Sequence, residues 1–367
     1  MSKILVLGGY GHFGKKIAEA LIIEGIPVIL VGRNHEKMIS FQTELANKYP
    51  SSEVECFVFD IFKSLDKHLK QLQPKIVINT CGPFQDQDYQ IAMACINNHS
   101  HYLDLADARD FVRDISMLND KAVQHNVAVI SGASSVPALT SAVIEEYKPF
   151  FSKLNGLEFG INSAQQTPGG LATTEAILSY TGKEIPKFSG ARGKIFGWQD
   201  LHRVKLPECG KRWMSNCSIP DLDLFPPKYG FKSIQFSGGV ESGFLHLGLW
   251  VISWLIRAGL PVSLKNHANV FYRISKFFDR FGSDAGGMYI FINGMDFQNR
   301  HKTVKWYIIA KKNHGQFIPT IPAIVLAKKI YNNQYSTPGA QPCVGLVTLK
   351  ECLEEMTDLD ITTYVEN

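Results

Sequence analysis

The sequence lacks the features that mark several special classes of protein. No run of about 18 apolar residues occurs, so no helix is predicted to cross a membrane. The seven cysteines form no C-x-x-C pair and their number is odd, which favours reduced thiols in the cytoplasm over a disulfide framework. The first apolar run has only four residues and leads into glycines, so we expect no secretory signal.

Neither sign of charge is in large excess. The chain has 38 Lys and Arg against 34 Asp and Glu, a formal net charge of +4, and the two signs are interspersed. This pattern does not predict a nucleic-acid-binding face, and a small anionic ligand would account for the surplus equally well. His99 and His101 have no Cys, Asp or Glu pattern around them that would complete a metal site, so no metal is predicted.

A cluster of glycines follows the first apolar run. Residues 4–7 have the composition of a buried parallel strand, and helical spacing of apolar residues begins at Phe13. The cluster fits G-x-G-x-x-G at a strand-to-helix turn, the context in which this motif binds a dinucleotide pyrophosphate. The alternative is a tight turn that only needs small residues. The predicted cofactor-binding residues are Gly8, Gly9, Tyr10, Gly11, His12, Phe13 and Gly14.

The length of 367 residues exceeds one hydrophobic core of typical size. Up to residue 132, short apolar runs alternate with helical or polar stretches, which predicts an α/β Rossmann-type domain with a parallel sheet. The pattern then changes, and we predict an α+β domain with a mixed or antiparallel sheet at residues 133–330 and a C-terminal surface segment at 331–367. The six strands predicted in the first domain are residues 4–7, 27–31, 56–59, 76–78, 102–105 and 127–130.

The residues after the second and third strands bear on the choice of cofactor. Arg33 and Asn34 stand where NAD-binding proteins usually carry an acidic residue for the ribose hydroxyls. A guanidinium can instead pair with a 2′-phosphate, so we predict NADP(H), with NAD as the alternative. A solvated loop residue is the other interpretation of Arg33. Asp60 either reaches the adenine amino group or caps the following helix.

The next two strands carry the motifs of a known family. The fourth ends in V-I-N-T-C-G-P-F at residues 77–84, and a helix containing Ala94-Cys95 leads to H-Y-L-D-L-A-D at residues 101–107. From Lys3 to about Pro137 the chain resembles the nucleotide-binding domain of the saccharopine dehydrogenase-like family. The resemblance implies an NAD(P)-dependent oxidoreductase that transfers a hydride to or from a small-molecule C=N, C=O or C=C substrate.

Two loops are the candidates for the reaction site. The loop after the fourth strand lies where the strand order reverses, so it is predicted to line the nicotinamide ribose; a structural turn is the alternative. Its predicted cofactor-binding residues are Asn79, Cys81, Gly82 and Pro83. The candidate catalytic proton donors, in the fifth strand and directly after it, are Tyr102, Asp104 and Asp107. Hydrogen bonds that only fix the loop are their alternative role.

The second domain is less informative. Strands are predicted at residues 157–161, 288–293 and 303–310, and helices at 171–180, 245–255, 266–278 and 323–330. Residues 182–232 are rich in Gly, Pro, Lys and Arg, which predicts a mobile insertion. Residues 244–260 are apolar nearly all round, which predicts a helix buried in the core or in a subunit interface; a helix on a membrane surface is the rarer case. We expect a homodimer through this domain.

Two further functions remain open at the level of sequence. A non-catalytic NADP(H)-binding sensor or scaffold is favoured by the lack of an unmistakable acid–base pair. A membrane-surface reductase of a lipid precursor is favoured by residues 244–260. The main prediction is an oxidoreductase with a small-molecule substrate, without nucleic-acid or membrane partners.

Overall fold

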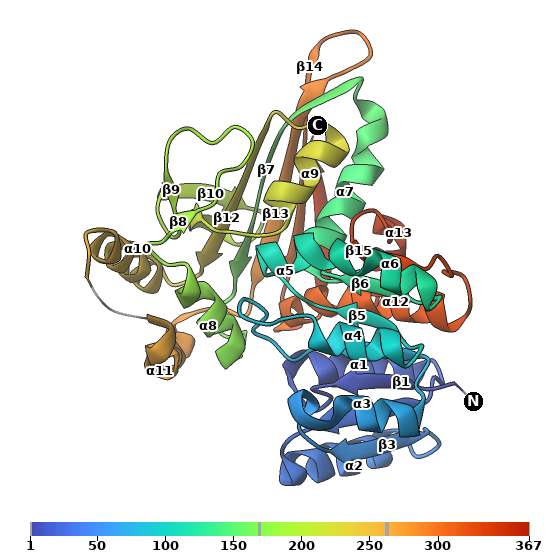
Figure 1. Cartoon of the computed structure of the whole chain (residues 1–367). Coiled ribbons are helices and arrows are strands. Elements are labelled where there is room, and N and C mark those ends of the chain that lie inside the picture. The colour runs from blue at the N-terminus through green and yellow to red at the C-terminus, as the bar shows by residue number, and fades with distance from the viewer. Residues whose placement is uncertain (1, 168–169, 261–263, 367) are drawn as a thin grey trace. The chain divides into compact units, whose positions relative to one another are not determined.

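The computed structural model describes residues 2–167, 170–260 and 264–366. The chain forms two compact units, one made of Met1–Leu139 with Phe317–Glu355 and the other of Thr140–Gln316 with Met356–Asn367 (Figure 1). This division differs from the predicted boundaries at residues 132 and 330. The C-terminal part of the chain is shared between the two units and is not a separate surface segment.

The first unit is built on a seven-stranded sheet in the order β15-β6-β5-β4-β1-β2-β3. All six neighbouring pairs are parallel, so the predicted Rossmann-type α/β fold is confirmed. The strand order reverses between β1 and β4, as required for a dinucleotide crossing the carboxyl edge. The strands are β1 (Ile4–Leu7), β2 (Val28–Gly32), β3 (Val54–Val58), β4 (Ile76–Asn79), β5 (His101–Asp104), β6 (Ala128–Ser131) and β15 (Gly339–Pro342).

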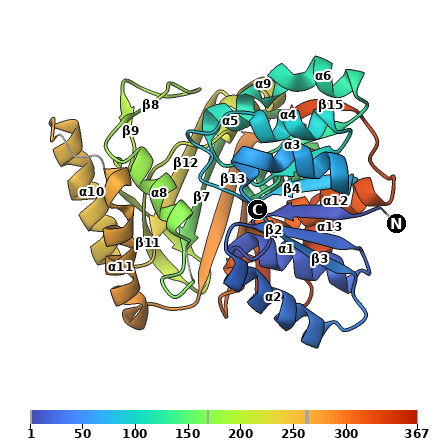
Figure 2. The same ribbon diagram turned by 60° about the horizontal axis from the view of Figure 1, so that its bottom comes forward.

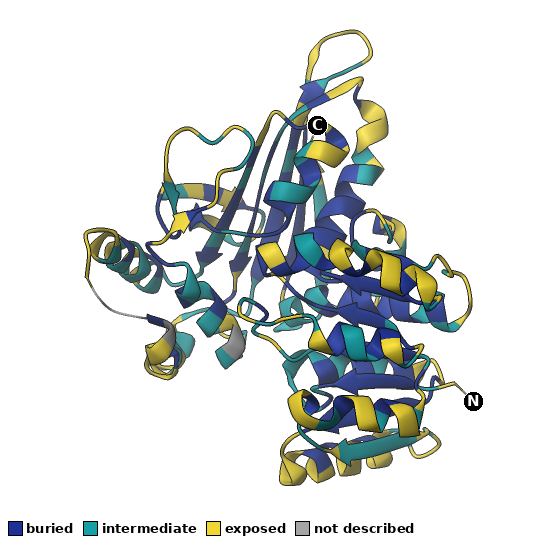
Figure 3. Ribbon diagram, viewed as in Figure 1, coloured by how far each residue is buried: buried dark blue, intermediate teal, exposed yellow. Residues whose placement is uncertain are grey.

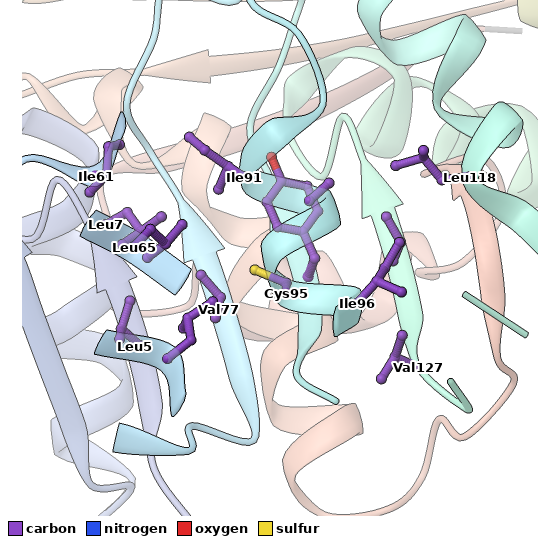
Figure 4. Close-up of a cluster of buried hydrophobic side chains, with 14 of the residues drawn as sticks. Leu5, Leu7, Ile61, Leu65, Val77, Ile91, Cys95, Ile96, Leu118 and Val127 are labelled. Carbon is purple, nitrogen blue, oxygen red and sulfur yellow. The ribbon is translucent and has the colours of Figure 1, made fainter. Parts of the chain in front are cut away.

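Helices cover both faces of this sheet because its strands are apolar on both sides. One face packs on α3, α4 and α6, in a cluster that joins strand residues such as Leu5 and Val77 to Leu65 and Ile96 (Figure 4). The helices of the unit are α1 (His12–Ile23), α2 (His35–Lys48), α3 (Ile61–Leu72), α4 (Gln90–Asn97), α5 (Arg109–Asp114), α6 (Asn119–Gln124), α12 (Ile321–Tyr331) and α13 (Leu349–Glu354).

Helix α12 and strand β15 correct the predicted organisation of the C-terminal part. Eight of the residues of α12 are buried, and the helix contacts α1, β4 and β5 of the first unit. Strand β15 pairs with β6 and extends the sheet. An apolar helix of this kind has to be covered, and the face of the parallel sheet supplies the cover. The first unit is therefore completed by residues predicted to lie in the second domain or on the surface.

The second unit contains a mixed sheet in the order β10-β11-β12-β7-β13-β14-β16 (Figure 2). Only β12 and β7 pair in parallel, and the other neighbours are antiparallel, which confirms the predicted α+β class. The strands are β7 (Lys153–Ser163), β10 (His202–Leu206), β11 (Gly210–Asn216), β12 (Ser233–Val240), β13 (Gly286–Met295), β14 (His301–Ala310) and β16 (Ile361–Glu366), with a separate pair β8 (Glu184–Ile185) and β9 (Ile195–Phe196).

The segment predicted to be a mobile insertion is largely ordered. Residues 182–232 contain β8–β11 and the helix α9 (Asp221–Tyr229). In β10 the buried residues Val204 and Leu206 alternate with the exposed Arg203 and Lys205, as expected for a strand with one buried face. The basic residues make this alternation hard to recognise in the sequence. The other helices of this unit are α7 (Thr140–Tyr147), α8 (Leu171–Ser179), α10 (Gly243–Arg257) and α11 (Ala268–Phe278).

Helix α10, which the sequence predicted to be buried in a core or an interface, is only partly covered, through half-buried residues such as Leu249 and Ile252. Its two buried residues are polar, His246 and Ser253. Hydrogen bonds explain their burial: a ring nitrogen of His246 lies 3.0 Å from the Ser215 hydroxyl, and the Ser253 hydroxyl donates to the Trp250 carbonyl at 2.6 Å. The apolar side chains of α10 are intermediate or exposed (Figure 3). None of the helices within the described ranges is long and apolar enough to cross a bilayer.

Candidate functional site

The turn between β1 and α1 is shaped by glycines that no other residue could replace without movement. Gly8 has a φ of +78°, in the left-handed region that favours glycine, and a Cβ there would lie 2.6 Å from the Thr80 hydroxyl. A Cβ on Gly14 would lie 2.2 Å from the Gly8 carbonyl oxygen. Helix α1 begins after Gly11 without a side-chain cap or an acidic residue in its first turn. The turn thus offers an uncapped helix N-terminus to an anion.

Tyr10 connects the glycine turn to the turn after β2. Its hydroxyl accepts hydrogen bonds from the backbone N–H of Arg33 at 3.0 Å and of Asn34 at 2.8 Å. Its ring also fills the space beside Gly32, where a Cβ would meet the Tyr10 ring at 2.1 Å. The position of Arg33 at the carboxyl edge of the sheet is therefore fixed by a residue of the predicted pyrophosphate turn.

Two of the predicted cofactor-binding residues are helix caps. Asn34 begins α2 and its side chain accepts from the Lys37 N–H at 2.8 Å. Asp60 begins α3 and accepts from the Phe62 N–H at 3.1 Å. Capping was one of the two roles considered for Asp60, and one carboxylate oxygen is occupied in this way. Contact of either residue with a cofactor stays a prediction.

The loop after β4 is fixed by buried polar groups. Asn79 is fully buried; its side-chain amide donates to the Tyr102 hydroxyl at 3.2 Å, and its oxygen accepts the Cys81 N–H at 3.0 Å. The Thr80 hydroxyl donates to the Leu7 carbonyl at 2.7 Å, which holds the loop against the end of β1. The Gln87 side chain donates to the carbonyls of Cys81 and Pro83 at 2.7 and 2.9 Å.

Cys81 and Arg33 lie close enough to affect each other electrostatically. Burial raises the pKa of the Cys81 thiol to about 12, and the positive charge of Arg33 opposes this shift. The thiol is thus neutral at physiological pH. Arg33 follows the end of β2 and Cys81 follows the end of β4, so both lie at the carboxyl edge of the sheet. Gly82, by contrast, is exposed, and Pro83 is half-buried.

Of the three candidate proton donors, Tyr102 and Asp104 are fully buried. One Asp104 oxygen accepts three hydrogen bonds, from the N–H of Ala106 at 3.0 Å, the N–H of Gly132 at 2.8 Å and the Ser131 hydroxyl at 2.9 Å. The other oxygen has no hydrogen-bond partner among the described residues. Burial raises the pKa of Asp104 to about 6, although these hydrogen bonds lower it. The geometry matches the alternative in which Asp104 fixes the loop.

Asp107 is the exposed member of the three. Its carboxylate accepts a hydrogen bond from the Gln85 side chain at 3.2 Å, which ties the end of the β5 loop to the β4 loop. A group that exchanges a proton with a substrate has to be reachable, and Asp107 meets this condition where Tyr102 and Asp104 do not. The catalytic role of each residue stays a prediction.

The site also contains residues that the sequence did not single out. Thr80 lies within the recognised motif, but nothing in the sequence shows that its hydroxyl closes the gap to β1. Gln87 has no sequence signal at all. Ser131 and Gly132 bind Asp104 from the end of the next strand in the sheet, 27 and 28 residues further along the chain. Within the described ranges, no group of three His, Cys, Asp or Glu side chains could hold a metal ion.

Comparison with known proteins agrees with the motifs. Residues 4–133 match the family described as the saccharopine dehydrogenase NADP binding domain, so the resemblance seen in the sequence is confirmed. A saccharopine dehydrogenase-like oxidoreductase of Mus musculus is 30% identical over 152 residues, which cover 37% of this chain and 35% of that protein. The Bos taurus protein of the same description is 27% identical over 253 residues, 60% of this chain and 56% of the relative. The matches thus span about a third to a half of these relatives.

A solved structure with a loosely similar arrangement is an amine dehydrogenase from Mycobacterium smegmatis. It is 9% identical, with a TM-score of 0.48, and the match covers 94% of this chain and 95% of that chain. Similarity at this level carries no argument about the reaction.

Proposed function

Because residues 4–133 of this chain match the saccharopine dehydrogenase NADP binding domain, we propose that the protein is an NADP(H)-dependent oxidoreductase acting on a small molecule. The observation that carries the proposal is the turn between β1 and α1. Its backbone carries no side chain at Gly8, Gly9 and Gly11, it precedes an uncapped helix N-terminus, and it lies beside the β4 loop at the strand-order reversal. This geometry fits a pyrophosphate.

Each part of the carboxyl edge then has a task. The Gly8–Gly14 turn would hold the pyrophosphate through backbone N–H groups, and Arg33, braced by Tyr10, would pair with the 2′-phosphate. The loop from Asn79 to Pro83 would lie against the nicotinamide ribose. The nicotinamide, when bound, supplies hydride-transfer chemistry; the residues of the chain orient the reactants and exclude water.

Asp107 is our proposed proton donor or acceptor, since it is the exposed member of the β5 loop. Tyr102 and Asp104 would act as positioning residues that hold this loop through Asn79 and Gly132. Asp107→Asn should lower the rate of turnover and leave the affinity for NADPH within about twofold, because the amide keeps the shape but cannot accept a proton. Loss of cofactor affinity in this variant would instead indicate a structural role.

The decisive experiment uses NADPH deuterated at the transferring carbon of the nicotinamide. Incubation of the protein and this cofactor with a metabolite extract should place deuterium in one product, detected by mass spectrometry. Tight NADPH binding without deuterium in any metabolite would favour the non-catalytic sensor or scaffold. Absence of NADPH binding would overturn both.

The wider setting of the protein stays a prediction. We propose a homodimer formed through the second unit and a cytoplasmic location, in keeping with the seven free cysteines. Trp198 and Trp306 are core residues with 2% and 1% exposure, so these two tryptophans do not contribute to such an interface. Light scattering that gives 41.0 kDa at micromolar concentration would reject the dimer.

A further inference from the structure

The second unit carries an exposed apolar surface on α10. Phe244, Leu247, Val251, Trp254 and Leu255 are between 36% and 72% exposed, while His246 and Ser253 of the same helix are buried. The exposed residues recur at intervals of three and four, so they form one stripe. A surface helix of a globular protein normally buries such a stripe and exposes its polar face. Helix α10 exposes this stripe, and the side of the helix that packs on the protein carries the buried His246 and Ser253 together with the half-buried Leu249, Ile252 and Ile256.

A second stripe lies on α11 and the turn after it. Val270, Ile274, Phe277 and Phe281 are 54%, 45%, 56% and 71% exposed, at the same helical spacing. Figures 1 and 2 show α10 and α11 side by side. Rings connect the stripes, because Phe244 stacks on Phe278 at 5.4 Å and Phe278 in turn lies beside Phe277 and Phe281. We call these two stripes together the α10–α11 face.

The excess of positive over negative charge lies in the same segment. Residues 243–281 contain five Lys or Arg and one Asp, whereas the rest of the chain has 33 residues of each sign. The whole formal surplus of +4 therefore belongs to this segment. Arg273 and Lys276 of α11 and Arg280 of the turn after it are exposed. Lys276 pairs with Asp279 at 2.9 Å, and Arg280 lies over the Phe277 ring at 4.4 Å. A helical period places these basic residues on one flank of the apolar stripe.

A basic pocket adjoins the α10 stripe. It has a volume of about 420 Å³, and Trp254 and Arg257 of α10 line it together with Arg192 and Gln199. Arg257 donates to the Gln199 side-chain oxygen at 2.8 Å, which directs the Gln199 amide nitrogen elsewhere. That nitrogen is buried and has no partner among the described residues. It therefore offers a donor to an acceptor that the described side chains do not supply.

The pocket is not uniformly positive. Lys194 also lines it but is paired with Glu184 at 2.8 Å, and Asp200 accepts a hydrogen bond from Gln235 at 3.0 Å. Neither Arg192 nor Arg257 has a carboxylate partner in the part of the chain that the structure describes. Two uncompensated guanidinium groups and an unpaired amide donor suit a phosphate or carboxylate.

We propose that the α10–α11 face binds the surface of a membrane that contains anionic lipids, with an anionic headgroup at the Arg192–Arg257 pocket. An apolar face that enters the acyl boundary, a basic flank and an exposed Trp254 are the features of an interfacial helix pair. A second copy of the chain is less suitable, since two such faces would bring like charges together. The inference does not depend on the proposed function, because it requires neither cofactor nor turnover.

The test is flotation of the full-length protein with vesicles. Wild type should float with vesicles of phosphatidylcholine containing about one third phosphatidylserine and much less with phosphatidylcholine alone. Raising the salt to about 0.5 M should weaken the binding, because the screening length falls to a few ångströms. The fluorescence of Trp254 should shift to the blue on binding, and Trp254→Phe should reduce that shift.

Two variants and their matched controls locate the binding surface. Arg273→Glu with Arg280→Glu should lower partitioning onto anionic vesicles at least about tenfold, since each basic residue near such a surface contributes on the order of fivefold. Phe277→Ser with Phe281→Ser should lower it by a similar factor. The control is Phe297→Ser with Lys153→Glu: Phe297 is 75% exposed, and both residues lie at the far end of β7 and β13. It should float like wild type.

Three outcomes would overturn the proposal. Wild type that does not float with anionic vesicles would do so directly. Equal flotation of the face variants and the control would show that binding occurs elsewhere. Face variants that convert a dimer into a monomer in light scattering, without flotation of wild type, would assign this face to a second copy of the chain.

Discussion

The hydroxyl of Tyr10 accepts the backbone N–H of Arg33 at 3.0 Å, so the glycine turn braces the residue that follows β2. The same oxygen accepts the Asn34 N–H, which lies at the start of α2. Tyr10 therefore connects two parts of the predicted cofactor site, one for the pyrophosphate and one for the adenosine ribose. Replacement of Tyr10 should affect both parts.

Tyr10→Phe should lower the affinity for NADPH by about two- to tenfold, the value of one or two hydrogen bonds. The fold should be retained, because the two N–H groups lie at the surface and water can replace the phenol. The measurement is titration of NADPH fluorescence. Unchanged affinity would mean that Arg33 does not depend on this brace.

Arg33→Ala should weaken NADPH binding by roughly 10- to 150-fold and leave NADH binding almost unchanged, because a charge-assisted bond to the 2′-phosphate contributes about 1.5–3 kcal/mol. Lys37→Ala is the matched control, since Lys37 is an exposed basic residue in the first turn of α2, four residues after Arg33. An equal loss for both cofactors in Arg33→Ala would indicate stacking on the adenine and reject the phosphate assignment.

Gly11→Ala should abolish most of the affinity for NADPH. A side chain at position 11 would block the approach of the anion, and a Cβ on Gly11 would also lie 2.9 Å from the Gly8 carbonyl oxygen. The turn itself must shift, so we expect at least about a tenfold loss of NADPH affinity. Gly248→Ala is the control, because a Cβ there would meet nothing within 4 Å.

Asp104→Ala should destabilise the first unit by about 3 kcal/mol, since three donors of Ala106, Ser131 and Gly132 lose their acceptor in a buried place. Asp104→Asn keeps an oxygen for these donors and should cost less. Amide hydrogen exchange of the peptides containing Ala106 and Gly132 reports the difference. Equal protection in the two variants would show that these hydrogen bonds do not hold the loop.

The burial of Asp221 should make the stability of the second unit depend on pH. It is fully buried and accepts from the Thr140 hydroxyl at 2.5 Å, and burial raises its pKa to about 7. Between about pH 4 and 7 the folded state holds a proton that the unfolded state releases. The contribution of Asp221 to the free energy of unfolding is therefore full below about pH 4 and is lost as the pH rises to about 7. Asp221→Asn mimics the protonated acid and should be more stable than wild type by about 2–4 kcal/mol at pH 8, and equal to it near pH 4.

Tryptophan fluorescence during denaturation by urea measures this difference in the right unit, because all five tryptophans lie in the second unit. The pH dependence of wild type alone does not isolate Asp221, because burial lowers the pKa of His246 to about 4 and this changes the stability with pH in the opposite direction. The comparison of variant and wild type removes the contribution of His246, which both proteins share. A difference between the two proteins that does not change with pH would contradict the assignment.

The sequence predicted those elements whose conformation depends on residues next to one another in the chain. The β1 strand, the glycine turn and α1 were found because a short apolar run, glycines and helical spacing follow each other directly. Strand β15 could not be found, since Gly339–Pro342 has no apolar run and becomes a strand only by pairing with β6. The same holds for Asp104: its position at the end of β5 was recognised, but the Ser131 hydroxyl that binds it comes from the end of the next strand in the sheet, β6.

The route of the chain has a consequence for its synthesis. Residues before Leu139 emerge first from the ribosome, yet the sheet they form receives its edge strand and one covering helix only from Phe317–Glu355. The sheet face that α12 covers stays uncovered until β7–β14 have been synthesised, and β16 then pairs with β14 in the second sheet. Neither unit can be completed by translation of a continuous segment, so the fragment 1–139 should bind chaperones or aggregate, and shortening at the C-terminal side should impair both units together.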